Sequence, residues 1–170
     1  MSQQQSPHKV PPSELQVSVR GTAATAVGGT DTVVVLWPSV SDPAGVFTES
    51  SVAATGTVLT VVRPGIYRID FFAALAAAGD LNIALSLNAA AAGALTTTPT
   101  DFLVVDAGAG TEGVIALQGE VSNGAGDGPV LCHAGRTIRL VVGDTLRCLV
   151  TAGVTLDANN TRLFIDQIGQ

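Results

Sequence analysis

Short apolar segments, each bounded by glycine, proline, asparagine or aspartate, recur along most of the chain. Leu81–Leu87 alternates apolar and polar residues, which is the period of a half-buried strand, whereas Thr32–Trp37 is a continuous apolar run that ends before Pro38. The pattern predicts about nine strands, at Leu15–Arg20, Thr32–Trp37, Thr57–Val62, Ile66–Leu75, Leu81–Leu87, Val114–Val121, Thr137–Val142, Leu146–Thr151 and Arg162–Ile168. Many short strands separated by turn residues are typical of a sandwich or barrel, so we expect an all-β domain.

The N-terminal segment differs from this pattern because it is polar and rich in proline. Such a composition favours an extended arm over a packed element, so we divide the chain into an arm at 1–14 and one domain at 15–170. The arm is either a tail without fixed structure or a segment held by a neighbouring subunit or a larger surface, and we expect it to dock. The expected docking residues are Pro7, His8, Lys9, Val10, Pro11 and Pro12.

The apolar segments on either side of Gly143–Thr145 predict a β-hairpin. A three-residue loop pairs Val142 with Leu146 and turns the apolar residues of both strands to one face. A two-residue loop would instead pair Leu140 with Arg147 and mix the two faces. We therefore expect the three-residue loop, with these residues pointing inward: Ile138, Leu140, Val142, Leu146, Cys148 and Val150.

Parts of the sequence resemble the C1q/TNF-like jelly-roll superfamily. The segment at 58–75 reads VLTVVRPGIYRIDFFAAL and is similar to its central signature, in which an apolar strand runs into Pro-Gly, an aliphatic residue and Tyr. The segment at 135–153, GRTIRLVVGDTLRCLVTAG, resembles its late hairpin, and TRLFIDQIG at 161–169 resembles its closing strand. The resemblance implies a jelly-roll β-sandwich in which Pro-Gly turns the chain between two sheets and Phe164 is a core aromatic. The family-like motif residues are Pro64, Gly65, Tyr67, Gly143, Asp144 and Phe164.

The chain also departs from that superfamily. Asp166 and Gln167 stand where relatives carry glycine and an aromatic residue, and 89–113 matches nothing. The N-terminus, Met1–Val10, has no apolar stretch of the kind found in a secretory signal, and no collagen-like stalk is present. We therefore expect the jelly-roll architecture to carry over, but not an animal signalling role.

Composition adds that this β-rich chain carries little charge. Charged residues make up 13% of the sequence, against about 25% in average soluble proteins, and apolar residues make up 46%. The longest unbroken apolar run, Phe71–Ala78, is far shorter than the roughly 20 residues of a membrane-spanning helix. We expect a water-soluble protein whose surface is either solvated by uncharged polar side chains or buried in an assembly. The net charge is −6 and the arginines are scattered, which argues against a nucleic-acid partner.

The sequence lacks a complete set of metal-ligating residues, so we expect no cofactor and no metal. Two cysteines and two histidines are too few for a four-ligand structural zinc site with paired spacings, and His133 beside Cys132 is interpreted as incidental. Several aspartates lie in glycine-rich or asparagine-rich segments without the alternating pattern of a calcium loop, at Asp101, Asp106, Asp127 and Asp157.

Catalysis is not expected either. The chain has no Gly-x-Ser-x-Gly motif, and the glycine-rich Asn123–Gly128 lacks the Lys-Ser/Thr that completes a phosphate loop. Asp70 lies within a predicted strand and is expected to face solvent or an arginine such as Arg68. Cys132 and Cys148 allow one disulfide at most, and the expected hairpin does not bring them together, so we expect two free thiols.

These observations favour a structural virion protein, either a tailed-phage capsid decoration (cement) protein or a head-spike protein, which binds and stabilises the shell as a jelly-roll homotrimer. Trimerisation would bury apolar β faces, which accounts for the shortage of surface charge. The expected partners are sister subunits and the major capsid protein, with no nucleic acid and no membrane. The expected location is the capsid exterior, after synthesis in the host cytoplasm. The alternative is a trimeric binding head that recognises a cell-surface glycan or protein, while a major capsid subunit is disfavoured by the missing basic arm.

Overall fold

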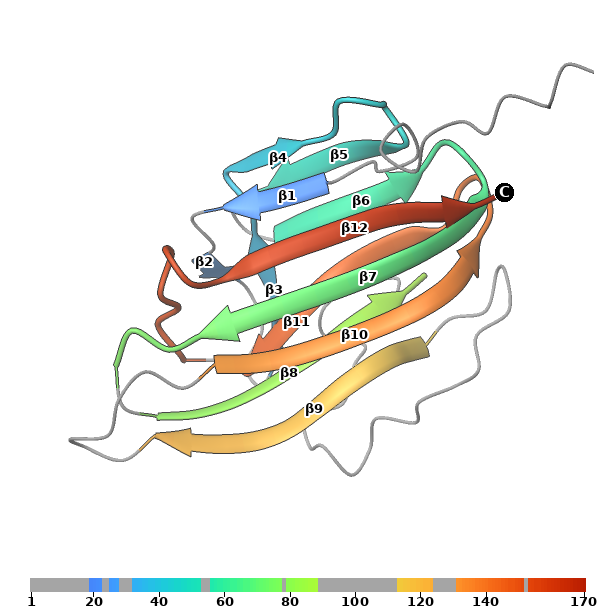
Figure 1. Ribbon diagram of the computed structural model, residues 1–170. Coiled ribbons are helices and arrows are strands. Elements are labelled where there is room, and N and C mark those ends of the chain that lie inside the picture. The colour runs from blue at the N-terminus through green and yellow to red at the C-terminus, as the bar shows by residue number, and fades with distance from the viewer. Residues whose placement is uncertain are drawn as a thin grey trace, which may run out of the picture.

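The computed structural model describes most of the predicted domain, in residues 19–22, 25–27, 32–52, 56–77, 79–88, 113–123, 131–151 and 153–170. The regular elements in these residues are all β-strands, which form two antiparallel sheets (Figure 1). Within this described part, no helix is long and apolar enough to cross a membrane.

Sheet A has five strands in the order β10-β7-β12-β1-β4. Their bounds are Leu131–Leu140 for β10, Gly65–Ala74 for β7, Arg162–Gly169 for β12, Val19–Thr22 for β1 and Ser39–Ser41 for β4. The longest strands, β7 and β10, pair without interruption from Leu131 opposite Ala74 to Leu140 opposite Gly65. This register decides which side chains meet on the outer face of the sheet.

Sheet B has seven strands, and β11 is its central strand because it pairs with β3, β6 and β8. The path runs β2-β3-β11-β6-β5, while β9 extends the sheet by pairing with β8. The bounds are Thr25–Val27 for β2, Thr32–Leu36 for β3, Phe47–Val52 for β5, Gly56–Val61 for β6, Gly79–Leu87 for β8, Gly113–Asn123 for β9 and Thr145–Thr151 for β11.

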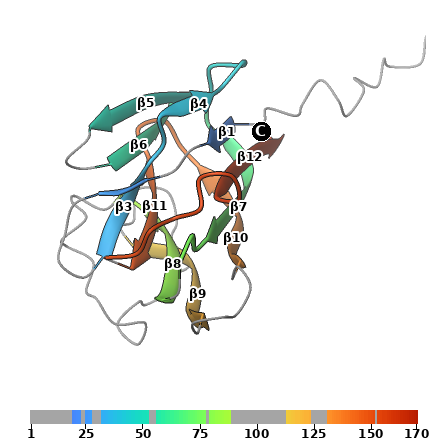
Figure 2. The same cartoon turned by 90° about the vertical axis from the view of Figure 1, so that its left-hand side faces the viewer.

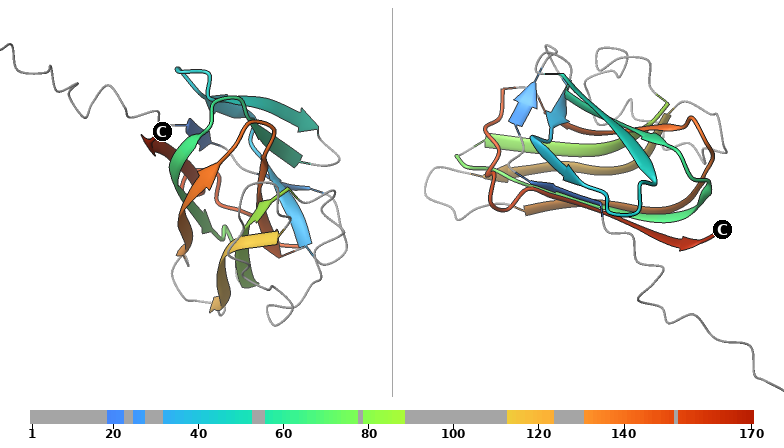
Figure 3. Two further views of the ribbon diagram at one scale, coloured as in Figure 1. Left: turned by 90° about the vertical axis from the view of Figure 1, so that its right-hand side faces the viewer. Right: turned by 90° about the horizontal axis from the view of Figure 1, so that it is seen from above.

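The hydrophobic core lies between the two sheets, which appear as separate layers in Figures 2 and 3. Along β7 every second residue is fully buried, so Tyr67, Ile69 and Phe71 point inward. The Trp37 ring packs edge-on against Phe71 at a centroid distance of 6.1 Å. The inner faces therefore bury alternate side chains of both sheets, as in a jelly-roll sandwich.

Most predicted strands are present, with shifted ends. β10 begins at Leu131, six residues before the predicted Thr137, and β1 covers only the end of Leu15–Arg20, whose earlier residues lie outside the described part of the chain. The sequence pattern missed β2, β4 and β5. In β5 only Phe47 is buried, so this strand shows no alternation that could reveal it.

The predicted hairpin around Gly143–Thr145 is wrong. β10 pairs with β7 in sheet A, whereas β11 lies in sheet B, so the turn carries the chain from one sheet to the other. Five of the six residues predicted to be inward are buried, but Val142 lies in the turn and is 62% exposed. The alternation is the same for two paired strands and for two strands on opposite sides of one core, so it could not distinguish these arrangements.

The prediction that Phe164 is a core aromatic is also wrong. In β12 the buried residues are Leu163, Ile165 and Gln167, so the period of two turns Phe164 to the outer face of sheet A.

Candidate functional site

The Pro64-Gly65-Tyr67 motif lies where the chain crosses from β6 in sheet B to β7 in sheet A. The Tyr67 ring is fully buried, and its hydroxyl donates a hydrogen bond to the Arg63 carbonyl oxygen at 2.6 Å. Burial raises the pKa of this hydroxyl. A Cβ at position 65 would collide with the Gln167 side chain, whose Nε2 donates to the Pro64 carbonyl oxygen at 3.3 Å. The motif thus turns the chain between the two sheets, as expected, and the Gln167 hydrogen bond links β12 to this turn, which was not expected.

The Gly143-Asp144 motif joins three segments at one end of the sandwich. Asp144 is 3% exposed, and its carboxylate accepts hydrogen bonds from Asn88 Nδ2 at 2.9 Å and from the Val141 N–H at 2.8 Å. Its carbonyl oxygen accepts a hydrogen bond from the Val61 N–H at 2.8 Å. The motif is structural, because its polar groups are used to hold the β10–β11 turn.

Among the described residues, a cluster of exposed functional groups lies on the outer face of sheet A. Register places His133, Phe72 and Arg162 in one row across β10, β7 and β12. The adjacent row holds Gly135, Asp70 and Phe164. Because side chains on one face recur every second residue, these rows bring together groups that are far apart in sequence.

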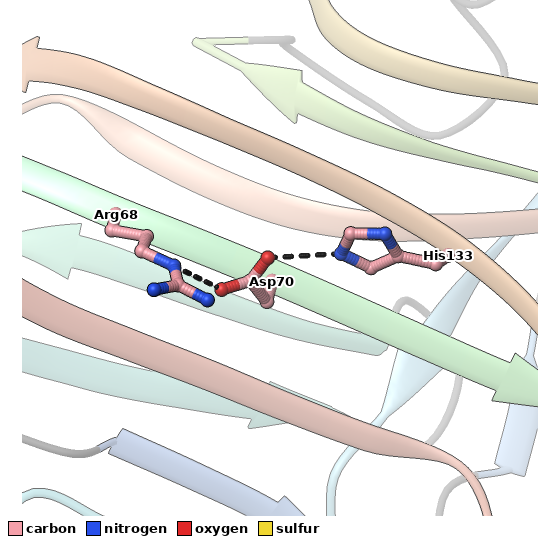
Figure 4. A network of polar contacts seen from close by, with 3 residues as sticks. All are labelled: Arg68, Asp70 and His133. Atoms are coloured by element: carbon pink, nitrogen blue, oxygen red, sulfur yellow. Dashed lines mark hydrogen bonds and ion pairs between the residues drawn. The ribbon is translucent and has the colours of Figure 1, made fainter.

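Asp70 is the centre of a polar network on this face (Figure 4). Its Oδ2 accepts a hydrogen bond from Arg68 Nε at 2.7 Å, and its Oδ1 lies 2.9 Å from His133 Nε2. A Cβ at Gly135 would lie 2.8 Å from Asp70 Oδ1 and 2.9 Å from His133 Nε2, so the contact needs a residue without a side chain there. The expectation that Asp70 faces Arg68 is confirmed, whereas the interpretation of His133 as incidental missed its contact with Asp70.

Aromatic rings continue the cluster beyond this network. The Phe72 ring stacks on the His133 ring at a centroid distance of 4.4 Å and meets Phe164 edge-on at 6.0 Å. Beside them is an open pocket of about 430 Å³. Its lining comes from the ends of three strands and a loop, at Phe72, Ala74, Leu131, Asn160, Arg162 and Phe164.

The remaining candidates for chemistry do not join this cluster. Cys132 and Cys148 are free and buried, on β10 of sheet A and β11 of sheet B. Burial raises the pKa of both thiols, which disfavours the reactive thiolate. Among the described residues, no group of three or more His, Cys, Asp or Glu side chains is placed to hold a metal ion.

Several predicted residues lie outside the described part of the chain, including the docking residues Pro7–Pro12 and the loop acids Asp101, Asp106 and Asp127. Asp157 is described and half-buried. Its carboxylate accepts hydrogen bonds from Asn160 Nδ2 at 2.6 Å and the Asn159 N–H at 2.8 Å, and these bonds lower its pKa.

No protein-family model matches the sequence, and no curated protein sequence is significantly similar to it. Solved structures do resemble the fold. The crystal structure of murine APRIL at pH 8.0 superposes with a TM-score of 0.60 at 13% identity, over 90% of this chain and 99% of that one. Murine APRIL at pH 8.5 and pH 5.0 gives TM-scores of 0.60 and 0.58, at 12% and 13% identity with the same coverage.

The chain has a TNF-like jelly-roll fold. The resemblance stated from Pro64-Gly65-Tyr67 and Gly143-Asp144 is thereby confirmed at the level of architecture. At such low identity the likeness concerns the fold alone, so the function must be argued from the outer face of sheet A.

Proposed function

We propose that this chain is a structural protein that self-associates as a homotrimer through the outer face of sheet A. The observation that carries the proposal is the exposure of apolar side chains on that face. Leu131 is 57% exposed on this face, and the half-buried rings of Phe72 and Phe164 lie beside it. Ile168, which is 53% exposed, lies at the end of β12, where a β-bulge interrupts the pairing with β7. These apolar side chains form a patch beside the Arg68–Asp70–His133 network. Such a patch, on a chain with few charged residues, is better buried against sister subunits than left in water.

An apolar interface of modest size would be sufficient for a stable assembly. Burial of about 1,000 Å² of apolar surface contributes roughly 25 kcal/mol before the costs of association are subtracted. A closed ring of three chains joins two different patches of every subunit head to tail, so both patches are proposed to lie on the outer face of sheet A.

At finer detail, the proposed role is capsid decoration, in which the trimer stands on a phage shell and stabilises it. The polar, proline-rich residues 1–14 would supply the docking contacts, and many weakly docked copies would gain strength through avidity. A decoration role requires no catalytic groups. The buried carboxylate of Asp144 is engaged in hydrogen bonds that hold a turn, which is compatible with such a role.

Shell binding tests the capsid role. Purified full-length chain is mixed with expanded phage shells and pelleted, beside a variant that lacks residues 1–14. The full chain is expected to co-sediment with the shells, and the deletion variant is expected to remain trimeric but unbound. A full chain that ignores shells but binds a glycan array would overturn the capsid role in favour of a binding head.

A matched pair of substitutions tests the face. Ile168→Glu places a charge at the end of β12 in sheet A, whereas Val142→Glu places the same charge on a similarly exposed apolar residue in the β10–β11 turn. Only Ile168→Glu is expected to weaken the trimer. Equal behaviour of the two variants would rule out this face as the interface.

A further inference from the structure

The pocket on the outer face of sheet A lies where β7 ends and β10 and β12 begin (Figure 1). Its volume of about 430 Å³ falls in the range of small-molecule sites. Phe72, Phe164, Leu131 and Ala74 make most of its lining apolar, and Arg162 adds a positive charge. The pocket thus combines a place for an apolar body with a group that attracts an anion.

Arg162 is held in position by its own backbone surroundings. Its Nη1 donates hydrogen bonds to the carbonyl oxygens of Ala158 and Thr161, both at 2.9 Å. Its Nε and Nη2 make no hydrogen bond within the described residues, and the ion pairs found there do not include it. The charge of Arg162 contributes to the lowered pKa of Asp157, whose carboxylate already accepts hydrogen bonds from Asn159 and Asn160.

A guanidinium anchored through one nitrogen retains donors on the other two, in the geometry that suits a carboxylate. Because one edge is already fixed, little side-chain entropy is lost when an anion binds. The Phe72 and Phe164 rings meet edge-on and both line the pocket, so an aromatic or aliphatic group in the pocket would contact ring surface. A purely apolar ligand would leave these donors unused, and a small inorganic anion would leave the rings uncovered.

We propose that this pocket binds a small monoanionic amphiphile, a free molecule with a carboxylate or sulfonate group on an aromatic or short aliphatic body. The anionic group accepts hydrogen bonds from Arg162, and the body covers Phe72 and Phe164. This site goes beyond the structural role, because it adds a ligand to a face otherwise assigned to sister subunits.

The test compares two fluorescent probes with nearly the same body. 1-Anilinonaphthalene-8-sulfonate carries the anionic group, and N-phenyl-1-naphthylamine lacks it. Titration of Ile168→Glu, the variant in which self-association is expected to be weakened, is expected to show one sulfonate probe bound per chain. The loss of charge-assisted hydrogen bonds in Arg162→Gln is expected to weaken the sulfonate probe about tenfold or more, and to leave the uncharged probe within about twofold. Arg162→Lys is expected to restore part of the affinity.

Two further variants keep the test decisive. Arg139→Gln removes the same charge from an exposed position on β10 that does not line the pocket, and is expected to bind both probes as the wild type does. Leu131→Glu changes an exposed lining residue, so folding should be unaffected, and its carboxylate is expected to repel the sulfonate probe at least tenfold. Octanoate is expected to displace the sulfonate probe at lower concentration than 1-octanol.

The proposed trimer interface and the proposed ligand site both include Phe72, Phe164 and Leu131, so the trimer could block the ligand. Both the wild type and Ile168→Glu are therefore titrated with the probes. Ile168 does not line the pocket, and the variant keeps the site open if the trimer covers it. Sedimentation without probe decides the trimer separately. The ligand site is refuted if neither chain binds the sulfonate probe, if Arg162→Gln weakens both probes equally, or if Arg139→Gln acts like Arg162→Gln.

Discussion

Asp144→Ala is the substitution for which the structure predicts the largest loss of stability at a polar residue. Asp144 is buried, and its carboxylate accepts hydrogen bonds from Asn88 Nδ2 and the Val141 N–H. Asn88 in turn accepts a hydrogen bond from the Thr145 N–H at 2.8 Å. Alanine removes the acceptor and leaves two donors without their partner, in a turn that joins the two sheets.

The expected cost follows from those two bonds. Hydrogen bonds to a charged group contribute about 1.5–3 kcal/mol each, and the partly buried donors place both near the lower end, so the loss is about 3 kcal/mol. With a typical urea slope of about 2 kcal/mol per M, the unfolding midpoint should fall by about 1.5 M. Asp144→Asn keeps one acceptor oxygen but places an amide NH₂ group against the second donor. It should therefore lose roughly half as much stability as Asp144→Ala.

Urea denaturation monitored by Trp37 fluorescence measures these values, with Glu49→Ala as the control. Glu49 is an exposed acid on β5, and its removal should change stability by less than about 0.5 kcal/mol. A double-mutant cycle with Asn88→Ala should give a coupling of about 1 kcal/mol. If Asp144→Ala is as stable as Glu49→Ala, or if the cycle is additive, the proposed role of this turn is incorrect.

Three further outcomes are expected. Tyr67→Phe should lose about 1 kcal/mol in urea unfolding, because the 2.6 Å bond to the Arg63 carbonyl disappears while the ring remains; an unchanged midpoint would contradict this. Burial raises the pKa of the Cys148 thiol above its ordinary 9.0. As the pH rises, this thiol therefore loses its proton at a lower pH in the unfolded chain than in the folded one. Stability should therefore fall as the pH rises above about 9, with Cys148 contributing up to about 1.4 kcal/mol per unit. Cys148→Ala should reduce that slope and leave the part due to Cys132 and Tyr67, whose pKa values burial also raises; an equal slope in both proteins would contradict it. Gly65→Ala should destabilise the fold by more than 1 kcal/mol in thermal unfolding, whereas the matched Gly79→Ala should cost less, because Gly79 has only a distant neighbour; the opposite order would contradict the close packing of β12.

The sequence predicted those strands in which burial alternates. In β7 the inward residues Tyr67, Ile69 and Phe71 are all large and apolar, so the period of two is visible in the sequence. β5 carries exposed threonine, serine and glutamate, and its pairing with β6 leaves no trace in composition. Phe164 was placed on the wrong face because an aromatic residue was assumed to be inward, although Leu163 and Ile165 already filled that side.

The candidate site was only partly predictable, because it depends on register between strands. Asp70 and His133 are separated by 63 positions and meet only when β10 lies against β7 with Gly135 opposite Asp70. The alternation of Arg68, Asp70 and Phe72 in one strand, and of His133 and Gly135 in another, was the available signal. This alternation shows that the residues within each strand lie on one face of that strand. It does not show that the two strands are neighbours with those faces on the same side of the sheet.

Sedimentation equilibrium across a dilution series tests the central claim most directly, because the claim is that the outer face of sheet A joins copies of this chain. The wild type is expected to sediment at about three times its 17.1 kDa mass, together with Val142→Glu. Ile168→Glu is expected to shift to the monomer mass over the same range. A wild type that remains monomeric at every concentration, or an Ile168→Glu variant as trimeric as Val142→Glu, would contradict the account.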